Sequence, residues 1–178
     1  WQGEIALLTL KGDIDDLGSL FQKGLEKPTF AKMASLSRQI NAFFALWLPW
    51  FCEHGRDENG VARFRNTYTV FAGGDDFFLI GPWESTLALA TVLREKFAAY
   101  VANPGISFSA GLSMTPPKTP VRQLARHTES ALAAAKGLEH CPSDVNDVFL
   151  AQAFPAVTRI LEQQVALGHG RPLWNVVP

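Results

Sequence analysis

The sequence has little cysteine and no long apolar run. Only Cys52 and Cys141 occur among 178 residues, which is too few for a disulfide framework or a protein-only zinc site. The most apolar stretch, residues 40–52, is interrupted by Pro49. It is too short to span a bilayer and is typical of a buried helix. We therefore expect a reducing, cytoplasmic setting and no membrane partner.

A strong charge bias is also lacking. The net charge of -1 gives no global attraction to nucleic acid or to a membrane, although a local basic groove would be hidden in that sum. At 47% hydrophobic residues, the chain can bury a sizeable core as one domain. No signal peptide is visible. Because a strand-like segment begins a few residues after Trp1, without an initiator Met, we expect a piece of a longer polypeptide.

The most informative stretch is residues 68–80, where Gly73-Gly74-Asp75-Asp76 is enclosed by apolar β-formers. Glycines tolerate the positive φ of tight strand connections, so this text predicts a β-hairpin with an acidic tip. Adjacent carboxylates repel each other, and a bound divalent cation would relieve that repulsion. Mg²⁺ prefers oxygen ligands and shares them with phosphates, which makes phosphoryl or nucleotidyl transfer the first hypothesis. A solvated turn is the alternative.

A second acidic cluster follows the first predicted strand, residues 4–11. There Gly12 to Gly18 leads from the strand through a turn to a short helix predicted near residues 19–25, and such a helix start can receive phosphate. Asp15 or Asp16 could simply cap that helix. Asp13 precedes the cap region, so we expect it at the carboxyl end of the strand.

The rest of the sequence predicts alternating helices and strands. A helical stripe runs over residues 29–47, and its aromatic side chains are interpreted as core rather than as a base-stacking surface. A loop is predicted over residues 53–65. Lys136 ends a helix, where it could offset the helix dipole or clamp a phosphate. Further predictions are helices over 83–102, 121–136 and 155–167, a strand with one covered face over 106–114, a short edge strand over 147–150, and a tail over 168–178.

This order predicts an α+β, ferredoxin-like split βαβ fold, with an antiparallel sheet and helices packed on one face. We place the main domain at residues 1–150 and a C-terminal helix and tail, a junction to a missing domain, at 151–178. The sheet brings Asp13 next to Asp75 and Asp76. Carboxylates that converge on one sheet edge are what a two-metal nucleotidyltransferase needs.

Several spaced motifs agree with one known family. They are Asp13-Ile14-Asp15-Asp16-Leu17-Gly18 with Leu20-Phe21, Leu36-Ser37-Arg38 with Phe43-Phe44, Gly73-Gly74-Asp75-Asp76 with Gly81-Pro82-Trp83, and Ser109-Ala110-Gly111 with Ala135-Lys136. Over about residues 5–136 the chain resembles the GGDD palm domain of the large subunit of type III CRISPR effector complexes. That palm is similar to GGDEF and nucleotide cyclase domains. The Gly-Pro-Trp and Leu-Ser-Arg motifs resemble the III-A (Csm) branch most.

The resemblance implies a function. In this family the palm, switched on when the complex binds target RNA, joins ATP into cyclic oligoadenylate second messengers with Mg²⁺ or Mn²⁺, two ions per site. The implied partners are ATP, the other subunits with guide RNA and target RNA, and missing domains of the same polypeptide. Because ATP sites in the family lie between two palms, the isolated piece is expected to bind nucleotide weakly or to be inactive.

The resemblance also implies site residues. Asp13, Asp75 and Asp76 would hold the metal ions, with the Ile14 carbonyl as an extra ligand. Four further groups are implied around the nucleotide: the Gly73 and Gly74 backbone, the Leu17 and Gly18 amides at the triphosphate, Lys136 against its charge, and Ser35 and Ser37 near adenine or ribose. The family's usual Asn after Asp-x-Asp is Asp16 here, which adds negative charge where nucleotide approaches.

Two alternatives stay open. One is a GGDEF-like enzyme that makes a cyclic dinucleotide from GTP. It is disfavoured by Asp75-Asp76 in place of Glu-Glu or Asp-Glu, by Phe77-Phe78 after the motif, and by the Gly-Pro-Trp text. The other is a non-catalytic palm that serves as a structural platform of the same complex.

Overall fold

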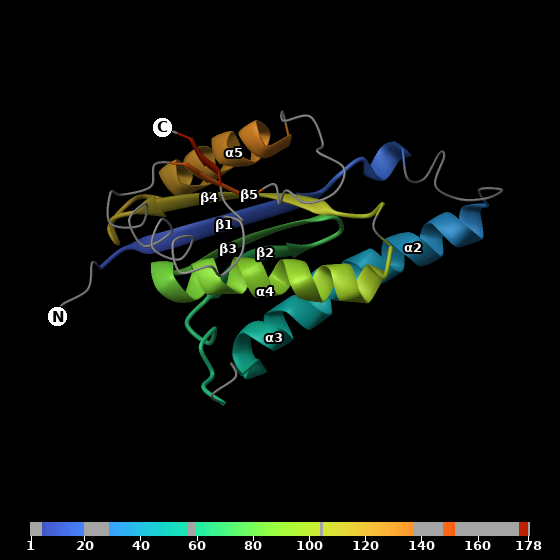
Figure 1. Cartoon of the computed structure of the whole chain (residues 1–178), viewed down its shortest axis with the longest axis horizontal. Coiled ribbons are helices and arrows are strands. Elements are labelled where there is room, and N and C mark those ends of the chain that lie inside the picture. Colours follow the sequence, from blue (N-terminus) through green and yellow to red (C-terminus); the bar gives the residue numbers. More distant parts are fainter. Residues whose placement is uncertain are drawn as a thin grey trace, which may run out of the picture.

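A sheet of six strands organises the chain (Figure 1). The computed structural model describes residues 5–19, 29–56, 60–103, 105–136, 148–151 and 175–177, the last two ranges by their backbone alone. The strands are β1 (Leu7–Ile14), β2 (Tyr68–Gly73), β3 (Asp76–Pro82), β4 (Phe108–Thr115), β5 (Val148–Ala151) and β6 (Asn175–Val177). The helices are α2 (Phe30–Ala42), the π-helical turn η1 (Phe43–Trp47), α3 (Leu48–His54), α4 (Trp83–Val101) and α5 (Val121–Lys136).

The strand order β2-β3-β1-β4-β5-β6 places β1 at the centre of the antiparallel part of the sheet. β1 pairs antiparallel with β3 and with β4, and β2 pairs antiparallel with β3. β5 and β6 extend the sheet in the parallel sense. β1 is a nearly continuous apolar run because both of its faces are covered: Leu8, Thr9 and Leu10 are all buried. The predicted α+β palm fold is confirmed.

Helices cover both faces of the sheet, α5 on one and α2, η1, α3 and α4 on the other (Figure 1). The prediction that all helices pack on one face is therefore wrong for α5. The contacts follow the alternation of side chains along β1. Thr9 and Lys11 bind Thr128 and Glu129 of α5, whereas Leu8 joins the core on the opposite face. This second layer places α5 against the strand that carries Asp13.

Gly111 of β4 lets α5 lie close to the sheet. A methyl group at Gly111 would stand 2.3 Å from the backbone nitrogen of Leu132 and 2.5 Å from the carbonyl oxygen of Thr128. Every residue of β4 is buried, so the predicted strand with only one covered face is wrong on that point. The polar appearance of one face arose because serine, glycine and threonine residues pack against α5 there, where larger apolar side chains would not fit.

The core between the sheet and the first helical layer is aromatic. Phe44 stacks on Phe97 with ring centroids 5.4 Å apart, and Phe77 meets Phe108 edge to face at 5.6 Å. Gly12 makes room for this cluster, since a methyl group there would stand 2.3 Å from the Phe77 ring. Phe43 and Phe44 are buried, which confirms the packing interpretation for the first part of the aromatic run.

The long first helix starts as predicted but runs further. Thr29 caps it, with its hydroxyl accepting a hydrogen bond from the Lys32 backbone N–H at 3.3 Å. The chain then continues through η1 and α3 to His54, so the loop predicted from residue 53 begins at Gly55. Pro49 lies in the first turn of α3, directly after η1, and the helical backbone continues across it.

The C-terminal predictions meet the structure only in part. β5 covers most of the predicted strand, but it lies between β4 and β6 and not at an edge. The boundary placed at residue 150 falls inside β5, and residues 175–177 of the expected tail form β6. The helix predicted over 155–167 lies outside the described residues, as does most of the one near 19–25. Within the part that the structure describes, no helix is long and apolar enough to cross a membrane.

Candidate active site

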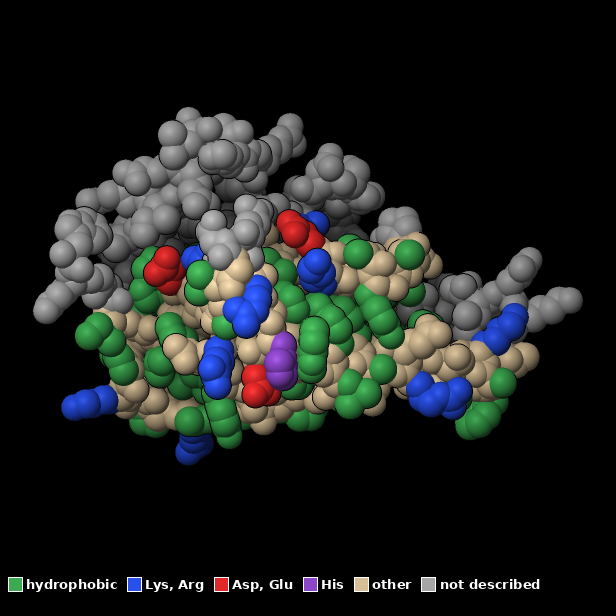
Figure 2. Space-filling model, turned by 90° about the horizontal axis from the view of Figure 1, so that it is seen from below, with side chains coloured by type: hydrophobic (Ala, Val, Ile, Leu, Met, Phe, Trp, Pro, Cys, Tyr) green, Lys and Arg blue, Asp and Glu red, His purple; other side chains and the backbone are tan. Residues whose placement is uncertain are grey.

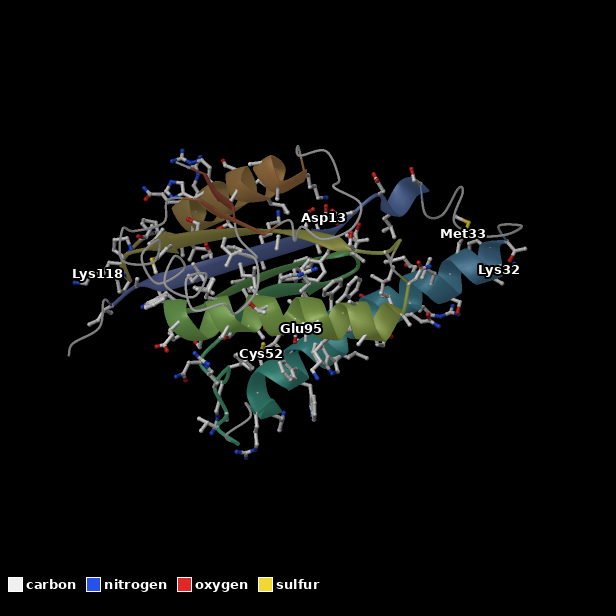
Figure 3. The ribbon with its side chains drawn as sticks, in the orientation of Figure 1. Asp13, Lys32, Met33, Cys52, Glu95 and Lys118 are labelled. Atoms are coloured by element: carbon white, nitrogen blue, oxygen red, sulfur yellow. The ribbon has the colours of Figure 1, made fainter. Side chains whose placement is uncertain are left out.

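Asp13 and Asp76 lie opposite each other on neighbouring strands. The register pairs Asp13 of β1 with Asp76 of β3 on one side and with Ser109 of β4 on the other. Directly opposed residues of an antiparallel pair direct their side chains to the same face, with Cβ atoms about 4.5–5.5 Å apart. Figure 3 shows Asp13 on the α5 side of the sheet, across from Glu95 and Cys52. Residues about sixty apart in sequence are thus neighbours.

The acidic turn, residues 73–76, is the predicted hairpin connection between β2 and β3. Gly74 has a φ of +68°, a left-handed conformation that glycine adopts without a steric penalty. Two hydrogen bonds hold the turn from outside. The Ile14 N–H donates to the Asp75 carbonyl at 3.1 Å, and the Gly74 N–H donates to the Oδ1 of Asn41 at 2.7 Å. The turn is therefore tied both to β1 and to α2.

Asp15 is held by two serines, Ser107 just before β4 and Ser109 within it. Its carboxylate accepts hydrogen bonds from the hydroxyls of Ser107 and Ser109, each at 2.7 Å, and its backbone N–H donates to the Ser107 carbonyl at 3.0 Å. The helix-cap alternative for Asp15 is not what these contacts show, since its carboxylate binds the neighbouring strand segment. Asp16 is exposed with a φ of +47°, and residues 17–19 are helical.

Two lysines lie among the acids on this face. The Lys136 ammonium binds Oδ2 of Asp13, and the Lys11 ammonium binds Oε2 of Glu129 in α5. Burial lowers the pKa of Lys136, and the nearby positive charge of Lys11 lowers it further. Lys136 therefore does more than face the end of its own helix dipole: it is the ion-pair partner of an acid in β1.

The surroundings of Asp76 disfavour its ionised form. Burial raises its pKa, the negative charge of Asp75 raises it further, and the positive charge of Lys11 acts in the opposite direction. This is the pattern expected of two adjacent acids packed at one strand end. A cation placed between them would stabilise both charged forms.

A small cavity of about 150 Å³ opens beside these groups, lined by Asp15, Asp16, Ser109, Ala135 and Lys136. Its lining combines carboxylates, a hydroxyl and an ammonium. A larger hollow of about 450 Å³ lies on the other side of the sheet, in the layer formed by α2, η1, α3 and α4. It is lined by apolar and aromatic side chains: Ala42, Phe43, Leu46, Trp47, Trp50 and Tyr100. Figure 2 shows this helix-covered side, where hydrophobic side chains lie among scattered lysines and arginines. The smaller cavity is the one with groups suited to phosphate and cation chemistry.

The structure brings together only some of the predicted site residues. Asp13, Asp76 and Lys136 share one face, Asp75 follows Gly73 and Gly74 in the turn, and Leu17 and Gly18 lie just beyond Asp16. Ser35 and Ser37 lie on α2, and no hydrogen bond of the described residues joins them to the acids. No group of three or more His, Cys, Asp or Glu side chains in the described ranges is arranged to hold a metal ion. The metal-ligand and nucleotide-binding roles therefore stay predictions.

Sequence reasoning missed Asn41 and the role of Ser107 and Ser109. A signal existed for each. Asn41 is a polar residue between buried Ile40 and buried Phe43, and the two serines alternate with apolar residues, as expected for a polar strand face.

Comparison with known proteins agrees with this geometry. The chain matches the family described as Cas10/Cmr2, second palm domain, over residues 6–140. A similar relative is the CRISPR system single-strand-specific deoxyribonuclease Cas10/Csm1 (subtype III-A) of Enterococcus italicus, 35% identical over 67% of this chain and 15% of the relative. Its namesake in Methanocaldococcus jannaschii is 33% identical over 71% of this chain and 16% of that protein.

Solved structures give the same result. A Csm1–Csm4 cassette in complex with AMPPNP superposes with a TM-score of 0.63 at 29% identity, covering 74% of this chain and 19% of that one. The structure of Csm1 from T. onnurineus superposes with a TM-score of 0.61 at 30% identity, and the match again covers 74% of this chain and 19% of that one. The chain thus spans less than a fifth of the length of these relatives. It belongs to the family of the Cas10/Cmr2 second palm domain, in its Cas10/Csm1 III-A branch.

Proposed function

We propose that this chain is the nucleotidyltransferase palm that joins ATP molecules into cyclic oligoadenylates within a type III CRISPR effector complex activated by target RNA. The observation that carries the proposal is the pairing of Asp13 with Asp76, next to a turn that holds Asp75. Neighbouring structures support the choice of nucleotide: Csm1–Csm4 cassettes are known in complex with one ATP, with pppApApA and with cA3.

The residues fit a hard divalent cation. The donors are carboxylate oxygens, which Mg²⁺ and Mn²⁺ prefer. Burial, and after it repulsion from Asp75, raises the pKa of Asp76, and the Lys136 ammonium already occupies the place of a cation on Asp13. We infer that Asp13, Asp75 and Asp76 would hold two Mg²⁺ or Mn²⁺ ions, with the Ile14 carbonyl as a further ligand.

Bound ions of this kind supply positive charge that favours ionisation of a ribose 3′-hydroxyl and stabilises the pyrophosphate that leaves. The chain's own residues bind and orient. Gly73 and Gly74 present bare backbone, which lets nucleotide phosphate approach the turn closely. Lys136 lies where it can exchange its contact with Asp13 for one with a phosphate oxygen. The amides of Leu17 and Gly18 are further donors for the triphosphate, and Ser35 and Ser37 would contact adenine or ribose.

The test uses the intact effector complex with guide RNA and matching target RNA. Complexes are incubated with labelled ATP or GTP and Mg²⁺ or Mn²⁺, and the products are separated. We expect cyclic oligoadenylates from ATP, lost in Asp75→Ala/Asp76→Ala. The double variant Glu53→Ala/Glu95→Ala, which removes two exposed helix carboxylates, serves as the matched control and keeps full activity.

The remaining outcomes separate the alternatives. A cyclic dinucleotide made from GTP would favour the GGDEF-like enzyme. Absence of any product, or equal product from Asp75→Ala/Asp76→Ala, would favour a palm that serves only as a structural platform of the complex.

A further inference from the structure

We propose that Asn41 of α2 is a positioning residue that orients the acidic turn for cation binding. The inference rests on the proposed function of that turn and extends it to a residue on the opposite side of the sheet from Lys136. Asn41 touches neither Asp75 nor Asp76 through a hydrogen bond; it acts through the backbone of Gly74.

Two peptide groups of the turn, with one peptide group between them, are fixed by different elements. The Gly74 N–H donates to Oδ1 of Asn41 at 2.7 Å, and the Asp75 carbonyl accepts from the Ile14 N–H at 3.1 Å. Gly74 is in the left-handed region at a φ of +68°, a conformation that an unrestrained glycine leaves readily. The two hydrogen bonds together define where the chain enters Asp75 and Asp76.

Gly73 lies directly beside this contact. A methyl group at Gly73 would stand 3.4 Å from Oδ1 of Asn41 and 3.8 Å from Cβ of Ala45, which are ordinary van der Waals distances. The second glycine of the motif thus supplies the N–H, and the first brings the turn next to α2.

The C-terminal end of α2, which carries Asn41, is anchored in the core. Asn41 lies in the last turn of α2, directly before η1, whose Phe43 and Phe44 are 2% and 0% exposed. π-helical turns inside helices are frequent at functional sites, and this one also contacts β2. The aromatic core therefore fixes the position of Asn41. Because Asn41 binds the Gly74 N–H, it in turn fixes the positions of Asp75 and Asp76, which follow Gly74 in the turn.

Cation sites need ligand oxygens held within a narrow geometry, which the supporting residues maintain. Loss of the Asn41 acceptor would leave the Gly74 N–H without this partner and let the turn sample other conformations. The expected result is weaker cation binding and slower chemistry, with little change in how ATP itself is bound.

The experiment compares three variants in the intact complex. Asn41→Leu has a similar volume but no acceptor, Asn41→Asp keeps an acceptor oxygen, and Asn66→Leu makes the same change at another exposed asparagine, in the loop before β2. Mn²⁺ binding is measured by electron paramagnetic resonance without nucleotide, counting only the sites lost in Asp75→Ala/Asp76→Ala. Steady-state kcat and KM for ATP are measured in parallel.

For Asn41→Leu we expect the Mn²⁺ dissociation constant to rise roughly 10-fold and kcat to fall roughly 10-fold. The KM for ATP should stay within about twofold of wild type. For Asn41→Asp, the Mn²⁺ dissociation constant and kcat should both lie within about threefold of the wild-type values. For Asn66→Leu, both should equal the wild-type values. Unchanged Mn²⁺ binding in Asn41→Leu, or an Asn41→Asp variant as impaired as Asn41→Leu, overturns the inference.

These outcomes are separable from failure of the proposed function. A wild-type complex that makes no product contradicts the proposed function, while its Mn²⁺ affinity still tests Asn41. A wild-type complex that binds no Mn²⁺ at Asp75 and Asp76 contradicts both.

Discussion

The ammonium of Lys136, the last residue of α5, binds the carboxylate of Asp13 in β1, although the two residues are 123 positions apart in the sequence. The contact joins the end of a helix to the end of the central strand, on the face that also carries Asp76. It places one positive charge where the proposed function requires cations and phosphate.

Removing that charge should weaken ATP use. For Lys136→Ala in the intact complex we expect kcat/KM for ATP to fall roughly 10- to 100-fold, the range for loss of a charge-assisted hydrogen bond. Lys136→Arg keeps the charge and should retain part of the activity. Lys118→Ala, at an exposed lysine of the loop before α5 (Figure 3), is the control. Equal rates in Lys136→Ala and Lys118→Ala would contradict the role.

Asp76→Asn should separate stability from activity. Because the folded-state pKa of Asp76 is raised, the folded chain holds this proton more tightly than the unfolded chain. Stability therefore falls as pH rises from the ordinary pKa of an aspartate through the folded value. At pH 7.5 we expect Asp76→Asn to match or exceed the wild-type stability, by about 0.5 kcal/mol or less because solvent screens a partly exposed site.

Urea unfolding of both chains at pH 7.5 and near pH 3.5 checks this prediction. The advantage of Asp76→Asn should shrink at the lower pH, where the wild-type carboxyl is mostly protonated in both states. Product formation by Asp76→Asn in the complex should be lost. An Asp76→Asn chain that is less stable at neutral pH would show that the ionised carboxylate stabilises the fold.

Gly111→Ala should disrupt the packing of α5 on the sheet. The added methyl would stand 2.3 Å from the backbone nitrogen of Leu132, which cannot move without displacing the helix. We expect a loss of about 1–3 kcal/mol in the free energy of unfolding. Gly18→Ala, at an exposed glycine whose added methyl meets no atom within 4 Å, should change stability by about 0.5 kcal/mol or less. Equal effects of the two substitutions would contradict the close approach of α5.

The bonds from Ser107 and Ser109 to Asp15 should be measurable as coupling. A double-mutant cycle of Asp15→Ala and Ser109→Ala, followed by urea unfolding, should give an interaction free energy of about 1 kcal/mol. A parallel cycle of Asp15→Ala with Ser130→Ala tests the background, since Ser130 bonds within α5 to the Arg126 carbonyl. Coupling of the same size in both cycles would mean that the serine contact is not its source.

The sequence by itself determined the local elements and the acidic turn. Apolar periodicity located the helices, β-formers on both sides of Gly73 to Asp76 predicted the hairpin, and these signals need only neighbours along the chain. The spaced motifs identified the family, and the order of predicted strands and helices placed Asp13 beside Asp76.

Only the tertiary structure decided what surrounds those acids. The position of α5 on the second face, the contact of Lys136 with Asp13, and the hold of Asn41 on Gly74 all join residues more than thirty positions apart. The missing side chain of Gly111 allows α5 to approach the sheet, and a missing side chain has no signature in hydropathy. Packing of whole elements, rather than local preference, therefore determined the environment of the site.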